Sequence, residues 1–286
     1  MRDFVYHRPT SLDEARRLAL DEGAMLLAGG QTLLRDMKHG RHSPTSLVDI
    51  TGVVPRQIER RGDAMSIGAG VTHTEVASSA TLRRHLPVLA DLVGHIGDPA
   101  VRNRGTLGGA LAANEPAGDY PAACLALGAA IHTTGRTIAA SEFFVGDRRT
   151  ALESGEIVIG ATFPITERAG YVKFLNPAAR YAMVGVFAAV TGEGRPRVAV
   201  TGARTNGAFR WWEVESALAT AFTPRGLNDA RLSLEGLIED LFADAAYRAH
   251  LAGVLARRAV ALAAGPAPGV MVLSHGSRSR TEVVHA

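Results

Sequence analysis

The chain has 286 residues, of which 47% are hydrophobic and 21% are charged, and its formal net charge is +3. This length allows two domains, and the composition is that of an ordinary globular protein, which excludes a disordered chain. The basic residues form no patch with interleaved aromatics, so nucleic acid is not an expected partner. The apolar runs are too short to span a bilayer and the first residues carry no signal-peptide pattern, so we expect no transmembrane segment and a cytoplasmic location.

Cys124 is the only cysteine of the chain. A disulfide within the chain is therefore excluded, and neither an iron–sulfur cluster nor a cysteine-based zinc site can be built from this chain alone. Cys124 lies in a run of small residues, where a buried, inert thiol is expected. The ten histidines show no H-E-x-x-H spacing and no G-x-S-x-G elbow is present, so we expect neither a metal site nor serine-based hydrolysis.

The first part of the chain predicts a small unit of strands and helices. Ser11 and Glu14 form a capping-box pattern at the start of a helix, and Gly23 ends that helix. The predicted elements are strands at residues 4–6, 25–27, 46–50 and 65–69 and helices that follow Ser11 and Thr32. We expect the first subdomain to end near residue 70.

A glycine pair follows the second of these strands. Residues 25–34 read M-L-L-A-G-G-Q-T-L-L, so an apolar run ends in Gly29-Gly30, and Gln31-Thr32 open an amphipathic helix. The free N–H groups and the positive dipole end of such a helix suit a pyrophosphate.

A second glycine pair occurs in R-N-R-G-T-L-G-G-A-L-A at residues 102–112. Thr106 followed by Gly108-Gly109 lets backbone N–H groups approach an anion, because glycine has no Cβ. Two such bends suit one diphosphate, although a glycine pair taken by itself more often marks an ordinary tight turn between a strand and a helix. Neither bend matches G-x-G-x-x-G or a P-loop, which disfavours a classical Rossmann fold.

The sequence from residue 72 onward predicts a helical region and a hairpin, followed by antiparallel strands and then further helices. The helical region covers residues 72–96 and begins at Thr72 or Thr74, and a buried helix is expected at 120–130. The later predicted elements are a hairpin at 131–138 around Gly135, antiparallel strands at 171–174, 181–191 and 195–202, and helices at 213–219, 230–242 and 247–264.

Three segments carry a family resemblance. They are A-G-G-Q-T-L-L at residues 28–34, I-G-D at 96–98 with V-R-N-R-G-T-L-G-G at 101–109, and E-P at 115–116 with D-Y-P-A-A at 119–123. Together they resemble the FAD-binding medium subunit of the molybdenum hydroxylases, of the carbon monoxide dehydrogenase and xanthine dehydrogenase type. The match runs in order from the first residues to about Ala264.

The resemblance implies an α/β and α+β fold. A two-subdomain FAD-binding domain is expected at residues 1–168, with subdomains of about 1–70 and 71–168. A C-terminal domain of an antiparallel sheet plus helices is expected at 169–265, and a flexible tail at 266–286.

The resemblance also implies the residues that hold FAD. Residues 26–33 and 106–110 would wrap the diphosphate, and Asp119 would contact the adenosine side. Lys173 would lie near the flavin ring, where a cation stabilises the anionic reduced flavin; without the resemblance it would be a solvated strand lysine. The implied cofactor-binding residues are Leu26, Leu27, Ala28, Gly29, Gly30, Gln31, Thr32, Leu33, Ile96, Thr106, Leu107, Gly108, Gly109, Ala110, Asp119, Val158 and Lys173.

Some positions leave two interpretations open. Arg102 and Arg104 flank the second bend and either pair with phosphate or are exposed at a helix end. Tyr181 either stacks on the isoalloxazine or belongs to the core.

Three positions depart from the pattern of the family, which commonly carries Ser at Ala110, His or Asn at Ala113 and Asp at Glu115. A lost hydroxyl or a longer carboxylate would weaken FAD retention by roughly 0.5–1.5 kcal/mol each. The departures affect the expected affinity for FAD more than the identity of the ligand.

The function implied by the resemblance is that of an electron relay. Hydroxylation would occur at a molybdenum cofactor on a large subunit, and [2Fe–2S] clusters on a small subunit would pass electrons to FAD in this chain, for release to an external acceptor. A dimer of heterotrimers is expected, and no residue of this chain is nominated as catalytic. The alternatives are a stand-alone FAD-dependent oxidoreductase and a non-catalytic nucleotide-binding scaffold. The substrate cannot be read from this chain.

Overall fold

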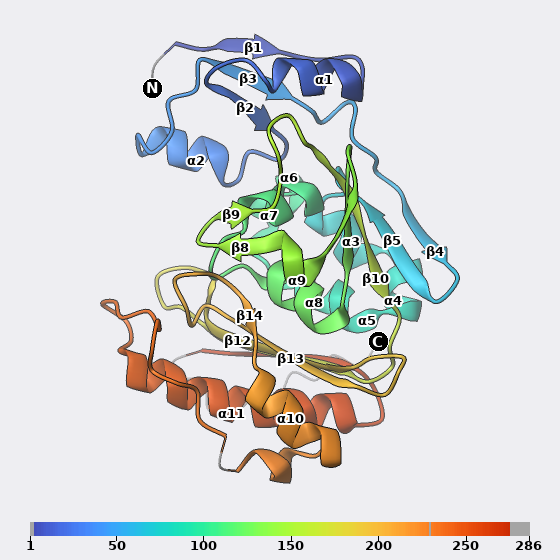
Figure 1. Ribbon diagram of the computed structural model, residues 1–286, viewed down its shortest axis with the longest axis vertical. Helices are drawn as coiled ribbons and strands as arrows, with labels where there is room; N and C mark the ends of the chain where they lie inside the picture. Colours follow the sequence, from blue (N-terminus) through green and yellow to red (C-terminus); the bar gives the residue numbers. More distant parts are fainter. Residues whose placement is uncertain (1–2, 229, 275–286) are drawn as a thin grey trace.

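The computed structural model describes residues 3–228 and 230–274. Figure 1 shows its elements stacked along the long axis: a small N-terminal sheet at one end, a central sheet surrounded by helices, and a C-terminal sheet backed by two helices at the other end. Among the described residues, no helix combines the length and the apolar character needed to cross a membrane.

The N-terminal unit is a parallel sheet with strand order β1-β3-β2. The Ser11 side chain accepts from the Glu14 N–H at 3.1 Å, but the Glu14 carboxylate reaches the N–H of Thr10 at 2.7 Å, so the capping box is shifted by one residue. The elements are β1 Val5–His7, α1 Leu12–Leu18, β2 Ala24–Leu27, α2 Leu33–Lys38 and β3 Ser46–Asp49.

The central sheet is antiparallel and has the order β4-β5-β10-β6-β7. Its strands are β4 Ile58–Arg61, β5 Ala64–Gly68, β6 Ala130–Thr133, β7 Thr137–Ala139 and β10 Val158–Pro164. The strand predicted at 65–69 thus pairs with β10, and the change of sheet falls between Asp49 and Ile58, ahead of the predicted boundary near residue 70. Met65 and Ile67 in β5 are fully buried in the central core, which explains why this strand belongs here.

Short helices cover the central sheet and lead to the second bend. Thr72 starts α3 with a complete capping box to Glu75, which settles the choice between Thr72 and Thr74. Every residue of α8 is buried, as expected for a helix that is apolar all round. The remaining elements of this part are α3 His73–Ser78, α4 Ala80–His85, α5 Pro87–Gly94, α6 Pro99–Arg104, α7 Leu107–Ala113, α8 Asp119–Leu127, α9 Ala140–Phe143, β8 Phe144–Gly146 and β9 Arg149–Thr150.

The C-terminal sheet has the order β14-β13-β12-β11-β15. The whole of β12 is buried, because α8 packs on one face of the sheet and α11 on the other. Its elements are β11 Ala169–Leu175, β12 Ala182–Val190, β13 Pro196–Thr201, β14 Phe209–Arg210, α10 Trp212–Thr220, the 3₁₀ turn Pro224–Leu227, α11 Ala245–Ala264 and β15 Gly269–Leu273.

The helix predicted at residues 230–242 is wrong. The described part of this segment is irregular: the Ile238 N–H donates to the Ala203 carbonyl at 2.9 Å, and Gly236 has φ +71. Leu232 and Leu237 are buried in the C-terminal core. These leucines are apolar because they are buried in this core, and their spacing in the sequence resembles that of a helix.

The flexible tail predicted at 266–286 is wrong for its first part. Residues 269–273 form β15, which pairs with β11 in parallel, so the sheet is antiparallel except at this edge. A parallel pair needs a crossover connection, and α11 lies within it. Residues 275–286 lie outside the described residues.

Candidate cofactor-binding site

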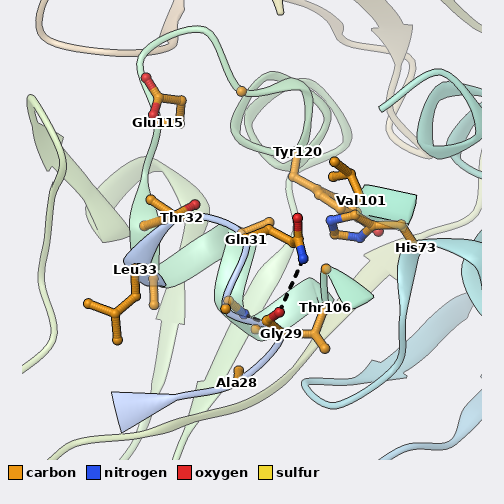
Figure 2. Close-up of a pocket in the computed structure, with 18 of the residues that line it drawn as sticks. Ala28, Gly29, Gln31, Thr32, Leu33, His73, Val101, Thr106, Glu115 and Tyr120 are labelled. Atoms are coloured by element: carbon orange, nitrogen blue, oxygen red, sulfur yellow. Dashed lines mark hydrogen bonds between the residues drawn. The ribbon is translucent and has the colours of Figure 1, made fainter. Parts of the chain in front are cut away.

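A cavity of about 970 Å³ lies between the N-terminal unit and the central helices. It is lined by the turn after β2, the start of α3, the bend between α6 and α7, and one end of β10. Figure 2 shows Gln31 of the turn after β2 on the side of His73 and Thr106, whereas Leu33 points away from them. Its volume is at the upper end of the range for small-molecule and cofactor pockets.

The two glycine bends meet in this pocket. A Cβ placed on Gly29 would lie 2.0 Å from the Arg104 carbonyl oxygen and 2.9 Å from the Gly105 Cα. A Cβ placed on Gly109 would lie 3.7 Å from the Cβ of Ala28. The close approach of the two backbones therefore depends on the absence of a side chain at Gly29.

The first bend leaves a run of N–H groups without partners. The N–H groups of Gly29, Gly30, Gln31 and Thr32 donate to no other described residue, whereas regular helical bonding begins with the Leu34 N–H, which donates to Gly30 at 3.1 Å. Gly30 has φ +74, which turns the backbone at this point. Successive unpaired N–H groups in such a turn form a concave anion-binding site.

The second bend has its N–H groups engaged in the fold. The Leu107 N–H donates to Val71 at 3.0 Å and the Gly108 N–H to Ala69 at 2.9 Å. The Gly109 N–H donates to the Thr106 hydroxyl at 3.2 Å. The expected N–H cradle is therefore not free here, and this bend contributes a close-fitting glycine surface.

Most of the predicted cofactor-binding residues line the cavity. Those that do so are Leu26, Ala28, Gly29, Gly30, Gln31, Thr32, Leu33, Ile96, Thr106, Gly108, Gly109, Ala110, Asp119 and Val158. Leu27, Leu107 and Lys173 do not line it, and Leu107 is fully buried in the central core.

Lys173 lies behind Asp119. Its side chain is fully buried, and its Nζ donates to Asp119 at 2.8 Å and to the His95 carbonyl at 3.4 Å. The Tyr171 hydroxyl donates to the other oxygen of Asp119. Burial, reinforced by this carboxylate, raises the pKa of Tyr171 well above its usual value. Lys173 thus supports Asp119, and its expected place beside the flavin ring stays a prediction.

The C-terminal sheet also holds the loop that precedes Asp119. The Thr201 hydroxyl donates to the Gly118 carbonyl at 2.7 Å and to the Pro116 carbonyl at 3.1 Å. One wall of the pocket is therefore fixed by the C-terminal sheet, through Thr201 at one point and Lys173 at another.

Four charged residues and a tyrosine lie together on the pocket wall, and we name them the rim cluster: Arg35, Asp36, Glu115, Arg148 and Tyr181. The sequence singles out Glu115 and Tyr181 but not Arg35, Asp36 or Arg148. The Arg35 guanidinium donates to the Tyr181 hydroxyl at 3.3 Å, and Arg148 donates to Glu115 at 2.9 Å. Arg148 also approaches Asp36 at 3.7 Å. These contacts connect α2, the β8–β9 turn and the loop before β12. The distance in sequence between these segments explains why no local pattern indicated that the five residues come together.

Arg102 does not point to the cavity as a phosphate ligand. Its guanidinium donates to the carbonyls of Ile96 and Gly97, each at 3.0 Å, and thereby holds the loop that carries Ile96. Of the two interpretations left open by the sequence, the structure thus supports neither an exposed nor a phosphate-bound Arg102.

His73 and Tyr120 also line the cavity, although neither was among the predicted cofactor-binding residues. Burial, with a smaller effect from the Arg102 charge, lowers the pKa of His73 to about 4, so its imidazole is neutral at pH 7. Burial also raises the pKa of Tyr120 well above its usual value.

Within residues 3–228 and 230–274, no group of three or more His, Cys, Asp or Glu side chains is arranged to hold a metal. Cys124 is buried, and burial raises the pKa of its thiol. The pocket therefore provides a concave set of amide donors, apolar walls such as Ile96 and Val158, and a buried carboxylate. This donor set fits the diphosphate and the flat ring systems of FAD.

Residues 2–166 match the family described as the FAD-binding domain in molybdopterin dehydrogenase. The chain belongs to this family and is of the type that forms the FAD-binding subunit of an oxidoreductase.

Individual relatives extend the similarity over most of the chain. It is 33% identical over 274 residues to the carbon monoxide dehydrogenase medium chain of Hydrogenophaga pseudoflava, covering 90% of this chain and 96% of that protein. It is 32% identical to the nicotine 6-hydroxylase medium subunit of Paenarthrobacter nicotinovorans, covering 89% and 95%. A chain of reconstituted CO dehydrogenase from Oligotropha carboxidovorans superposes with a TM-score of 0.82 at 30% identity, covering 91% of this chain and 97% of that one.

Proposed function

We propose that this chain is the FAD-carrying electron-transfer subunit of a molybdenum hydroxylase complex. It takes electrons from [2Fe–2S] clusters of a small partner subunit and passes them to an external acceptor, while the molybdenum cofactor lies on a large partner subunit. The observation that carries the proposal is the run of unpaired N–H groups at residues 29–32, held in contact with the second bend.

The residues of this chain bind and orient the cofactor. The amides of Gly29 to Thr32 hold the diphosphate, and Ile96 and Val158 contact its ring systems. Asp119, fixed by Lys173 and Tyr171, presents a carboxylate in a set position. When bound, FAD supplies the redox chemistry, since its isoalloxazine accepts and releases electrons.

The partner subunits are supported by the names of the relatives and by the composition of the chain. The relatives are called medium chains or medium subunits, which implies larger and smaller partners in those proteins. With one cysteine, this chain cannot build an iron–sulfur cluster by itself. We further propose a dimer of heterotrimers in the cytoplasm, which the mass of the purified complex and cell fractionation test.

The first experiment is a titration of the purified chain with FAD, followed by its visible spectrum. We expect bound flavin in a ratio of one FAD per chain. A protein that remains colourless with excess FAD would contradict the proposal and favour the scaffold alternative.

The second experiment uses the complex purified through a tag on this chain. We expect molybdenum and iron to co-purify, and the flavin absorbance to bleach anaerobically when the substrate of the complex is added. A chain that oxidises a substrate without partners would instead support the stand-alone flavoenzyme.

A further inference from the structure

His73 and Tyr120 form a buried pair on the pocket wall. His73 is the first residue of α3 and Tyr120 the second of α8, and their side-chain rings are 5.5 Å apart at an angle of 48°. The residues are 5% and 1% exposed, and both line the cavity. The pair therefore belongs to the pocket without being open to bulk solvent.

Both side chains carry polar atoms that the described residues leave without partners. The Nδ1 of His73 and the hydroxyl of Tyr120 are buried, and neither makes a hydrogen bond. Buried polar groups are almost always hydrogen-bonded, because leaving one unpaired destabilises the fold. Two such atoms on neighbouring rings in a cofactor pocket point to a ligand.

The pair lies close to the first bend. A Cβ on Gly105 would lie 2.6 Å from the Nε2 of His73, and a Cβ on Gly29 would lie 2.9 Å from the Gly105 Cα. Gly105 therefore packs between the imidazole of His73 and the backbone of Gly29, which opens the first bend. Figure 2 shows His73 and Tyr120 together, with Gln31 and Thr106 beside them.

The chemistry of the pair favours a hydroxyl over a phosphate, because a hydroxyl can both accept and donate whereas an ionised diphosphate only accepts. His73 is neutral, because burial and the Arg102 charge both disfavour its protonated form. Tyr120 keeps its proton for the same reason of burial. A neutral imidazole offers one donor and one acceptor, and a phenol offers a donor. These groups suit a hydroxyl.

We propose that His73 and Tyr120 hydrogen-bond a sugar hydroxyl of FAD next to the diphosphate. In FAD such hydroxyls adjoin the diphosphate on both sides, in the ribityl chain and in the ribose of adenosine. The inference rests on the proposed function, because it requires FAD in this pocket.

The test compares two properties of Tyr120→Phe, which removes only the hydroxyl. We expect the dissociation constant for FAD to rise between about twofold and tenfold, the effect of one hydrogen bond. The melting temperature of the protein without FAD should stay the same or rise, because an unpaired buried hydroxyl is removed. Tyr247→Phe, on the distant α11, is the matched control and should change neither property.

A second variant keeps the test independent of the first. His73→Phe should weaken FAD binding by a similar factor, and His73→Gln should restore part of the affinity because it can donate and accept. His250→Phe, at an exposed position of α11, is the control.

Titration with ADP identifies the hydroxyl. ADP carries the adenosine ribose and the diphosphate but no ribityl chain. If only FAD binding weakens, the partner is the ribityl chain. If Tyr120→Phe weakens FAD and ADP binding equally but leaves the binding of inorganic pyrophosphate unchanged, the partner is the ribose. Both results support the inference, whereas weaker pyrophosphate binding would assign the Tyr120 hydroxyl to the diphosphate and contradict it.

The inference is overturned if the wild type binds FAD and both Tyr120→Phe and His73→Phe bind it with unchanged affinity. A lower melting temperature with unchanged FAD affinity would assign the pair to packing alone. A wild type that binds no FAD would overturn the proposed function, and this inference with it, which is a different result from unchanged variants.

Discussion

The two walls of the pocket carry the same glycine pair but are held differently. On the first wall, the N–H groups of Gly29 to Thr32 have no partner among the described residues. On the second wall, Leu107 and Gly108 donate to Val71 and Ala69. The same Gly-Gly pair therefore has free amides on the first wall and hydrogen-bonded amides on the second, because the surrounding backbone supplies carbonyl acceptors only at the second pair.

The support behind the walls differs as well. The first wall belongs to the N-terminal unit, and the rim cluster connects it to the rest through ion pairs such as Arg35 with Glu115, whose side chains are 36% and 18% exposed. Such partly exposed pairs contribute little each. The second wall also includes Gly118 and Asp119, which follow the second bend, and these residues are held by contacts from the C-terminal sheet, through Thr201 and Lys173. We therefore regard the first wall as the adaptable one and the second as the fixed one.

The largest effect on the free energy of unfolding is expected when the Lys173 ammonium group, which holds Asp119 in the fixed wall, is removed. Lys173→Met leaves the buried Asp119 carboxylate without its cation, which should lower the free energy of unfolding by about 3–5 kcal/mol. Urea denaturation measures this change. The exposed Lys38→Met is the control and should be near neutral. The double variant Lys173→Met with Asp119→Leu should recover most of the stability but not the FAD affinity; no recovery would show that the ion pair is not the cause.

The next largest effect is the pH dependence of stability caused by His73, which lies beside the second bend. Its pKa is about 4 in the folded protein and near 6.5 when unfolded, so between these values the unfolded chain binds more protons and stability falls as pH falls. The wild type should lose about 3 kcal/mol between pH 6.5 and pH 4 beyond the loss seen in His73→Phe. Tyr120 and Arg102, which lie beside the imidazole in the wild type, are present in both proteins, so their own effects on stability cancel in the comparison. Parallel stability curves for the two proteins would contradict a buried neutral histidine.

A smaller effect on stability distinguishes Gly29 of the first pair from Gly109 of the second. In Gly29→Ala the new Cβ would meet the backbone oxygen of Arg104, which should cost about 1–3 kcal/mol of stability. In Gly109→Ala the new Cβ meets the Thr106 hydroxyl at 3.0 Å, and the better helix propensity of alanine, about 1 kcal/mol, offsets that contact. Thermal unfolding measures both. Gly52→Ala, with open space around its Cβ, is the control, and equal costs at Gly29 and Gly109 would contradict the difference described here between these two glycines.

Local patterns in the sequence predicted the features that depend on local physics. The strand before Gly29, the cap at Thr72 and the hairpin around Gly135 follow from hydrophobic spacing and turn chemistry, and the structure confirms them. The family resemblance, confirmed by the match over residues 2–166, identified the cofactor.

Features that depend on contacts between distant segments could not be read in this way. Leu237 has the spacing of a helix but is buried from an irregular segment. The strand at 269–273 exists because the edge of β11 is available to it. Likewise, the place of Lys173 behind Asp119 depends on how β11 packs against α8.

The most direct measurement of the central claim is amide hydrogen exchange of the whole chain, resolved by residue, with and without FAD. Without FAD, we expect the amides of Gly29 to Thr32 to exchange quickly and those of Leu107 and Gly108 slowly. FAD should slow exchange strongly at residues 29–32 and leave Leu107 and Gly108 as they were. Slow exchange at 29–32 before FAD is added, or no change there after it binds, would contradict the assignment of the first bend as the diphosphate donor.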